Sequence, residues 1–437
     1  MTSGSPGWVE RWRFGLAVLL VAVLAAAFAI GFRLSLGFAM RELAGASDVV
    51  SAMRALPVWA RVALPAFGGL CAGALGILVR RARGGGGVSN VMEAVVLGGV
   101  HLSMRVTLLK SAAAWLAIAS GGSLGREGPL IQFGGAAGDW VAARFGVTPE
   151  RARLLIAAGT AAGFSAAYNT PLAAVLFVLE VVTGVVVLDA ILPAVVATVV
   201  ATALTRLVAG EGPIYGQRAF GIHVPGELLA FAGLGVFTAL VAQAFMRVLS
   251  LGEDWFERSR LGLPWRPALG GALAGLWIAL APEVAGNGYE PLNALLDAKL
   301  ALGFVALLLV GKMLATTASV SSGSPGGVFT PTLLVGGASG FLYASALTAA
   351  GVPIGAPEGY ALVGMAAATA ATTHAPLMAA VMAFELSGDY AVVLPLMMAT
   401  AVATIVSRWL RRESIYTAEL HERGVGWEFT LDGRRRV

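Results

Sequence analysis

The apolar stretches of this chain are repeatedly interrupted by glycine and proline, and this pattern restricts the possible folds more than any other feature. Several stretches are shorter than the roughly 20 apolar residues that a full transmembrane helix needs. Short helices in lipid are tolerated only where they end inside protein or line a cavity. We therefore expect an all-α polytopic membrane protein of tilted, partly broken helices. The apolar stretches are residues 14–32, 62–79, 154–167, 172–188, 228–246, 300–318, 362–383 and 392–406.

Composition and charge agree with a membrane location. The chain is 57% hydrophobic and 13% charged, about half of the roughly 25% charge that is usual in soluble domains. Its net charge is +5, and arginines gather near both ends, which predicts that both termini face the cytoplasm. We expect the protein to lie in the inner membrane. No nucleic-acid partner is needed to explain these arginines. The single Cys71 excludes an internal disulfide and a thiolate metal cluster, and no metal or cofactor is expected.

An internal repeat is the second strong signal. The segment that runs from Gly159 to Glu180 has the same spacing of Gly, Pro and Glu as the segment from Gly364 to Glu385 (385 − 180 = 205). Two halves on one plan are typical of transporters whose repeats meet at a substrate site near the middle of the bilayer. We predict one domain over residues 1–437, with a first repeat at about 60–208, a second at about 228–409 and a C-terminal segment at 410–437.

Glu127 is the candidate functional residue, because it lies in a glycine-bracketed break between apolar segments. A carboxylate at this depth is costly unless it is paired or functional. Three glycine-rich clusters precede apolar segments, at 84–87, 125–128 and 321–327. Helix starts offer free N–H groups and a positive dipole end, so they bind anions. Read alone, each cluster fits a tight turn equally well, but together with Glu127 they favour an anion pathway.

At these residues the chain resembles the CLC family of chloride channels and chloride/proton exchangers. Residues 125–129 match the GREGP motif of that family, 327–331 its GxFxP motif and 85–89 a degraded GSGIP motif. The resemblance implies an inverted-repeat bundle, a homodimer with one pore per subunit, and a gate at Glu127 that competes with chloride. Bromide and nitrate are further candidate anions. The residues that it implies for anion binding are Gly86, Gly87, Arg126, Gly128, Val328, Phe329 and the pore tyrosine Tyr416.

Two departures from the family pattern bear on this expectation. Gly86 and Ser89 stand where the family usually has serine and proline, which leaves the choice between chloride and nitrate open, while Tyr416 argues against fluoride. Exchangers of the family usually carry two adjacent carboxylates where this chain has Glu180 and Val181. Without the inner proton carrier at Val181, we expect passive or loosely proton-coupled conduction, with chloride/proton exchange as the alternative. Glu180 is interpreted as a structural carboxylate at a helix end.

Other readings of the polar residues remain open. His374 precedes a proline and is the repeat mate of Asn169, so a hydrogen-bonding role is favoured over a proton relay. A more distant alternative is an intramembrane serine hydrolase with Ser322 or Ser324 as nucleophile and His374 as base. That alternative leaves Glu127 and the three helix starts unexplained, as does a purely structural scaffold. We do not expect an enzyme.

Overall fold

The predicted all-α architecture is confirmed by a computed structural model, which describes residues 8–81, 87–210, 214–216, 218, 220 and 226–426, without the side chains of 9, 43 and 209. Seven of the described helices are long and apolar enough to cross a membrane. The first half of the chain contains α1 (Trp8–Ala44), α2 (Val49–Ala55), α3 (Val58–Arg81), α4 (Val88–Val96), α5 (Met104–Ala119), α6 (Glu127–Phe145), α7 (Pro149–Tyr168), α8 (Pro171–Phe177) and α9 (Leu188–Ala209). The second half contains α10 (Glu227–Arg258), α11 (Trp265–Leu280), α12 (Tyr289–Leu296), α13 (Leu302–Ser321), α14 (Phe329–Ala349), α15 (Pro357–Thr373), α16 (Pro376–Ser387), α17 (Val393–Leu410) and α18 (Thr417–Glu422).

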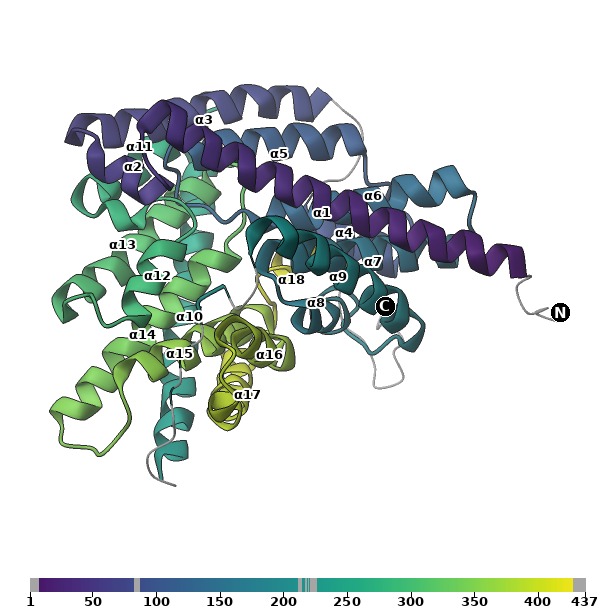
Figure 1. The fold of residues 1–437 in the computed structure, drawn as a ribbon. Coiled ribbons are helices and arrows are strands. Elements are labelled where there is room, and N and C mark those ends of the chain that lie inside the picture. The colour runs from purple at the N-terminus through teal and green to yellow at the C-terminus, as the bar shows by residue number, and fades with distance from the viewer. Residues whose placement is uncertain are drawn as a thin grey trace.

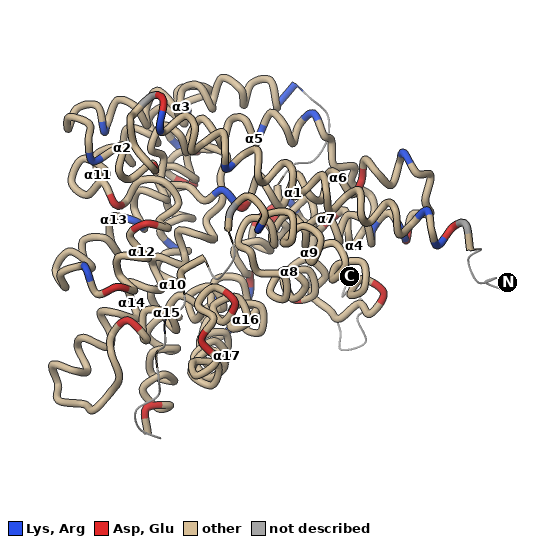
Figure 2. Tube along the Cα trace, viewed as in Figure 1, with Lys and Arg blue, Asp and Glu red and all other residues tan. Residues whose placement is uncertain are grey.

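The helices α3 to α9 and α11 to α17 follow the same order of long and short elements. The long α1 lies across α6, α7 and α9 (Figure 1), and α10 packs against α15 and α17. Lys, Arg, Asp and Glu are sparse along the helices and concentrate toward their ends (Figure 2). The bundle therefore presents mostly apolar surface, as expected of a protein surrounded by lipid.

Glycine allows a close helix crossing in each half. In the first half, a Cβ atom on Gly134 of α6 would overlap the carbonyl oxygen of Gly159 on α7. In the second half, a Cβ on Gly336 of α14 would overlap the carbonyl oxygen of Gly364 on α15. Backbones that approach this closely need small residues at the crossing. The spaced glycines of both repeats thus set the position of α6 and α14, the helices that begin at the site.

The predicted apolar stretch 172–188 does not form one helix. After α8 the chain makes a π-helical turn at Val178–Val182. The hydroxyl of Thr183 then lies 2.6 Å from the carbonyl oxygen of Val185 and about 3 Å from those of Val178 and Leu179, and it can donate to one of them at a time. The Thr183 amide also donates to the carbonyl oxygen of Val178 at 2.8 Å, and the helix stops here, inside the bundle. The equivalent helix α16 also ends early, at Gly388 in the left-handed conformation.

Candidate functional site

The loops before α6 and α14 pair with each other at the centre of the molecule. The amide of Gly125 donates to the carbonyl oxygen of Gly327 at 2.7 Å, and the amide of Gly327 donates to that of Gly125 at 2.8 Å. These two hydrogen bonds form an antiparallel β-bridge. Because each helix begins two residues later, their N-terminal ends meet at one place. A Cβ atom on either glycine would collide with the Glu127 carboxylate.

The Glu127 carboxylate is bound to the start of α14. Glu127 is only 1% exposed. Its Oε1 accepts hydrogen bonds from the amides of Phe329 at 2.8 Å and Thr330 at 3.3 Å, and its Oε2 accepts one from the Thr330 hydroxyl at 2.9 Å. These amides belong to the first turn of a helix and have no intrahelical partner. The negative charge of Glu127 therefore lies at the positive end of the α14 dipole.

A buried tyrosine extends this contact. The hydroxyl groups of Tyr168 and Thr330 lie 2.8 Å apart. Since the Thr330 hydroxyl hydrogen is used on Glu127, the Tyr168 hydroxyl donates to Thr330. Tyr168 is the last residue of α7, so the hydrogen-bonded chain joins α6, α7 and α14 at a single carboxylate. Neither Tyr168 nor Thr330 was predicted from the sequence, where Thr330 is distinguished only by its position inside the GxFxP motif.

A cavity of about 360 Å³ opens beside Glu127 and brings most of the predicted residues together. Phe329 directs its amide to Glu127, while its buried ring packs on Phe164. Arg126 lines two other cavities instead. Gly86 lies outside the described residues. The predicted residues that line the cavity are Gly87, Glu127, Gly128, Val328 and Tyr416. Ser89 and Lys110 also line it.

Tyr416 is held in the cavity wall by contacts on both sides. Its ring meets the edge of Phe177 with ring centres 6.1 Å apart. The preceding residue, Ile415, donates its amide to the carbonyl oxygen of Thr372 at 2.8 Å, near the end of α15. Tyr416 thereby stays beside Glu127 although it follows the last long helix. A tyrosine hydroxyl can donate to an anion, so its position suits an anion pathway.

Ser89, which replaces the usual proline of the family motif, has a structural contact of its own. Its hydroxyl donates to the carboxylate of Glu419 on α18 at 2.6 Å. One turn further along each helix, the Arg423 guanidinium lies 2.6 Å from the carboxylate of Glu93. The two contacts fasten α18 to α4. The departure from the motif thus supports the position of the C-terminal segment that carries Tyr416.

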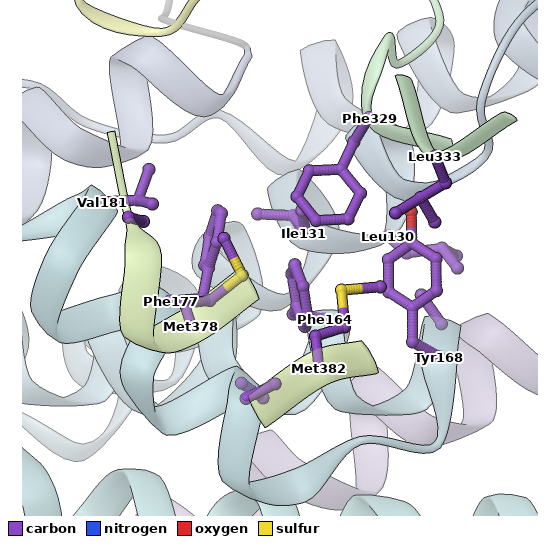
Figure 3. Close-up of a cluster of buried hydrophobic side chains, with 14 of the residues drawn as sticks. Leu130, Ile131, Phe164, Tyr168, Phe177, Val181, Phe329, Leu333, Met378 and Met382 are labelled. Atoms are coloured by element: carbon purple, nitrogen blue, oxygen red, sulfur yellow. The ribbon is translucent and has the colours of Figure 1, made fainter. Parts of the chain in front are cut away.

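The inner position of the expected proton route is apolar. Val181 is 4% exposed and lies at one end of a buried cluster that contains Phe177 and Met378 (Figure 3). Phe164 stacks on Phe177 with ring centres 4.6 Å apart and meets the edge of Phe329. Val181 itself offers no group that can bind a proton.

Glu180 and Glu385 each cap a helix of the opposite half. Glu180 accepts from the amides of Leu377 at 3.2 Å and Met378 at 2.6 Å at the start of α16. Glu385 accepts from the amides of Leu172 at 3.0 Å and Ala173 at 2.8 Å at the start of α8. Both carboxylates thus accept hydrogen bonds at a helix start, and a structural role for Glu180 stays a prediction.

His374 occupies a helix end and is engaged there. It adopts the left-handed conformation with φ of 59°, as its repeat mate Asn169 does with φ of 58°. Its Nε2 lies 3.3 Å from the hydroxyl of Ser407. The hydroxyl of Ser322 donates to the carbonyl oxygen of Ser319 at 2.7 Å. The structure therefore records hydrogen-bonding roles for these groups and gives no support to a Ser322–His374 pair.

Seven helices that are long and apolar enough to cross a membrane, with a buried carboxylate and a cavity between them, define a helical membrane protein. The family model for the voltage gated chloride channel matches residues 68–408. The chain belongs to this family, and the resemblance to CLC proteins is confirmed.

Individual relatives agree with this assignment. The chain is 39% identical over 414 residues to the "Putative chloride channel protein ClcB-like" of Ralstonia nicotianae, covering 92% of this chain and 95% of the relative. It is 36% identical over 413 residues to the "Voltage-gated ClC-type chloride channel ClcB" of Citrobacter koseri, covering 92% and 97%. Its fold is similar to that of "a slow cyanobacterial Cl-/H+ antiporter", with a TM-score of 0.84, 25% identity, and coverage of 97% of this chain and 99% of the other.

Proposed function

We propose that the protein carries chloride across the membrane through a CLC-type pore gated by Glu127. The observation that carries the proposal is the binding of the Glu127 carboxylate by the free amides of α14. A chloride ion has the same charge as a carboxylate and is stabilised by the same groups. Chloride and the Glu127 carboxylate therefore compete for one place. Protonation of Glu127 removes its charge and favours the anion.

Transport is passive or loosely coupled to protons in this proposal. Val181 has no group that can transfer a proton to Glu127. The carboxylate of Glu180 already accepts two hydrogen bonds at the start of α16. Chloride/proton exchange is the alternative. It is supported by the structural similarity to the cyanobacterial antiporter and would require protons to reach Glu127 through water in the cavity.

The proposal is tested in liposomes that contain the purified protein and a chloride gradient. Chloride efflux and external pH are recorded together, with an ionophore to clamp the membrane potential. We expect chloride efflux with little proton movement. If chloride drives protons against their own gradient, the protein is a chloride/proton exchanger and the proposal of passive transport is wrong. A lack of protein-dependent chloride flux would overturn the function itself.

Further expectations concern the anion and the assembly. Bromide and nitrate should compete with chloride, and Tyr416 should disfavour fluoride. We also propose a homodimer in the inner membrane with cytoplasmic termini. Leu172 on α8 is 58% exposed, and Leu377 on α16 is 52% exposed. The helices α8 and α16 meet here, and each is capped by a glutamate of the opposite half. The two leucines offer an apolar surface for a second copy.

A further inference from the structure

The cavity beside Glu127 has more acidic than basic side chains in its wall. Its described lining contains four carboxylates but only two cationic groups. A wall of this composition repels an anion unless some of its carboxylates carry protons. The ionisable side chains of the described lining are Lys110, Arg411, Tyr416, Glu127, Glu253, Glu419 and Glu422.

Of the four carboxylates, Glu253 is the one that is half-buried without a partner. Glu127 is bound at the start of α14. Glu419 accepts a hydrogen bond from the Ser89 hydroxyl at 2.6 Å, and Glu422 is exposed on α18. Glu253 lies on α10 and makes no hydrogen bond or ion pair with the described part of the chain. Its carboxylate is therefore available to exchange a proton with water in the cavity.

The nearest charges around Glu253 are mostly of its own sign. Glu257 lies one turn further along α10, and Glu419 and Glu422 act on Glu253 from α18. Both glutamates of α18 are exposed, so water reaches this part of the wall. A proton on Glu253 removes its repulsion with all three carboxylates.

The cationic groups near this part of α10 have other contacts. Arg411 acts on the Glu253 carboxylate, but its guanidinium also lies 3.9 Å from the carboxylate of Glu413. Arg266 of α11 lies over the ring of Phe256 and donates to the carbonyl oxygen of Ser321. The helices α13, α14, α15 and α17, which pack on α10, place no ionisable side chain in the described lining of the cavity.

A chloride ion in the cavity would add one more negative charge to this group. Protonated Glu253 does not repel chloride, whereas ionised Glu253 does. The protonated form therefore binds chloride more tightly. Because coupling between two ligands is reciprocal, chloride must favour the protonated form by the same factor.

We propose that Glu253 binds the proton that accompanies chloride into the cavity. This role rests on the proposed function, because the chloride is the transported ion. A proton passes from water to the Glu253 carboxylate when chloride enters, and it returns to water when chloride leaves. Proton binding is thereby linked to chloride in a chain whose expected inner proton position is the apolar Val181.

The test is the pH dependence of chloride binding to the purified protein in detergent, measured by isothermal titration calorimetry. Glu127→Gln is the background, because Glu127 competes with chloride and would add a proton of its own. Glu253→Gln and Glu253→Asp are compared in this background. Glu257→Gln is the matched control, because Glu257 lies on the same helix but not in the described lining of the cavity.

We expect the dissociation constant for chloride in the background to fall by about fivefold or more between pH 8 and pH 5. Glu253→Gln should keep it near its pH 5 value at every pH, because a neutral amide imitates the protonated acid. Glu253→Asp and Glu257→Gln should retain the pH dependence. The same pH dependence in Glu253→Gln as in Glu257→Gln would overturn the proposal, as would a background whose affinity does not change with pH.

Proton uptake gives a second measurement that does not need the Glu127→Gln background. Chloride added to the weakly buffered wild-type protein should raise the pH that an indicator dye records. Glu253→Gln should take up fewer protons than Glu257→Gln. Equal uptake would contradict the role of Glu253 while chloride transport stands. A wild-type protein that neither binds nor transports chloride would instead refute the proposed function, and the role of Glu253 with it.

Discussion

The Oε1 atom of Glu127 lies 2.8 Å from the amide nitrogen of Phe329, so a side chain from the first residue of α6 caps α14. The two residues belong to equivalent motifs of the two halves, and the Gly125–Gly327 bridge holds their loops together. A carboxylate in this position satisfies amides that an anion would otherwise satisfy. The repeat therefore places the proposed gate of one half on the helix start of the other half that is proposed to bind the anion.

Replacement of Glu127 by glutamine should remove the gating while the pore still conducts chloride. The variant keeps the size of the side chain but loses its charge and its response to protons. Wild-type chloride flux should rise as the pH falls, because protonation weakens the hold of the α14 amides on Glu127. Glu127→Gln should conduct at least as well as the wild type at neutral pH and show no pH dependence. Liposome efflux at several pH values measures both, and abolished flux would contradict the gating role.

Gly327→Ala should displace the gate without changing a charge. A Cβ atom at this position would overlap the Glu127 carboxylate in its bound position. The carboxylate should then leave α14, so the flux should increase at neutral pH and depend less on pH. Gly303→Ala is the control, because a Cβ there meets nothing within 4 Å. An alanine variant that retains the pH profile of the wild type would show that the bound carboxylate does not block the pore.

Thr330→Val should weaken the closed state by removing one hydrogen bond to a charged group. Such a bond is worth about 1.5 kcal/mol, which corresponds to roughly a tenfold shift toward the released gate. Thr330→Ser keeps the hydroxyl and should behave like the wild type. Tyr168→Phe should cause a smaller shift in the same direction, because it acts on Glu127 only through Thr330. Flux at neutral pH measures the shift, and equal flux in the valine and serine variants would exclude this role.

Much of the fold and part of the site could be predicted from the sequence. Gly and Pro recur at equivalent positions because both halves need the same close helix crossings and helix starts, as Gly134 and Gly336 show. Glu127 was identifiable because an acidic side chain in an apolar break has few structural explanations. Short local motifs were enough to predict residues that contribute a backbone amide to the site, such as Phe329.

Contacts between distant side chains could not be predicted. Tyr168 and Thr330 are 162 positions apart, and no pattern in either segment indicates that their hydroxyls meet. Hydrogen bonds of this kind depend on how helices cross, and the sequence reveals a crossing only through its small residues.

Glu180 and Glu385 should behave as a matched pair of structural groups. Glu180→Gln and Glu385→Gln each weaken two hydrogen bonds at a helix start, at a cost of about 1 kcal/mol. We expect a similar decrease in the thermal unfolding midpoint for both variants and little change in the pH dependence of chloride flux. Loss of proton movement in Glu180→Gln alone, with unchanged unfolding, would instead assign Glu180 to a proton route.

Lys312 should be needed for stability rather than for transport. Its side chain is 0% exposed, and its Nζ donates to the carbonyl oxygens of Val284 at 3.0 Å and Gly286 at 2.7 Å, which joins α13 to the segment before α12. Lys312→Met preserves the apolar stem but leaves two buried carbonyl groups without a donor, at a cost of about 2 to 4 kcal/mol. Lys299→Met is the control, because Lys299 is 70% exposed and its ion pair with Asp297 lies at the surface, where such a pair contributes about 0 to 1 kcal/mol. Chemical unfolding in detergent should therefore show a large loss for Lys312→Met and a small one for Lys299→Met. Equal losses would mean that water or a rearranged loop satisfies the carbonyl groups in the absence of the ammonium.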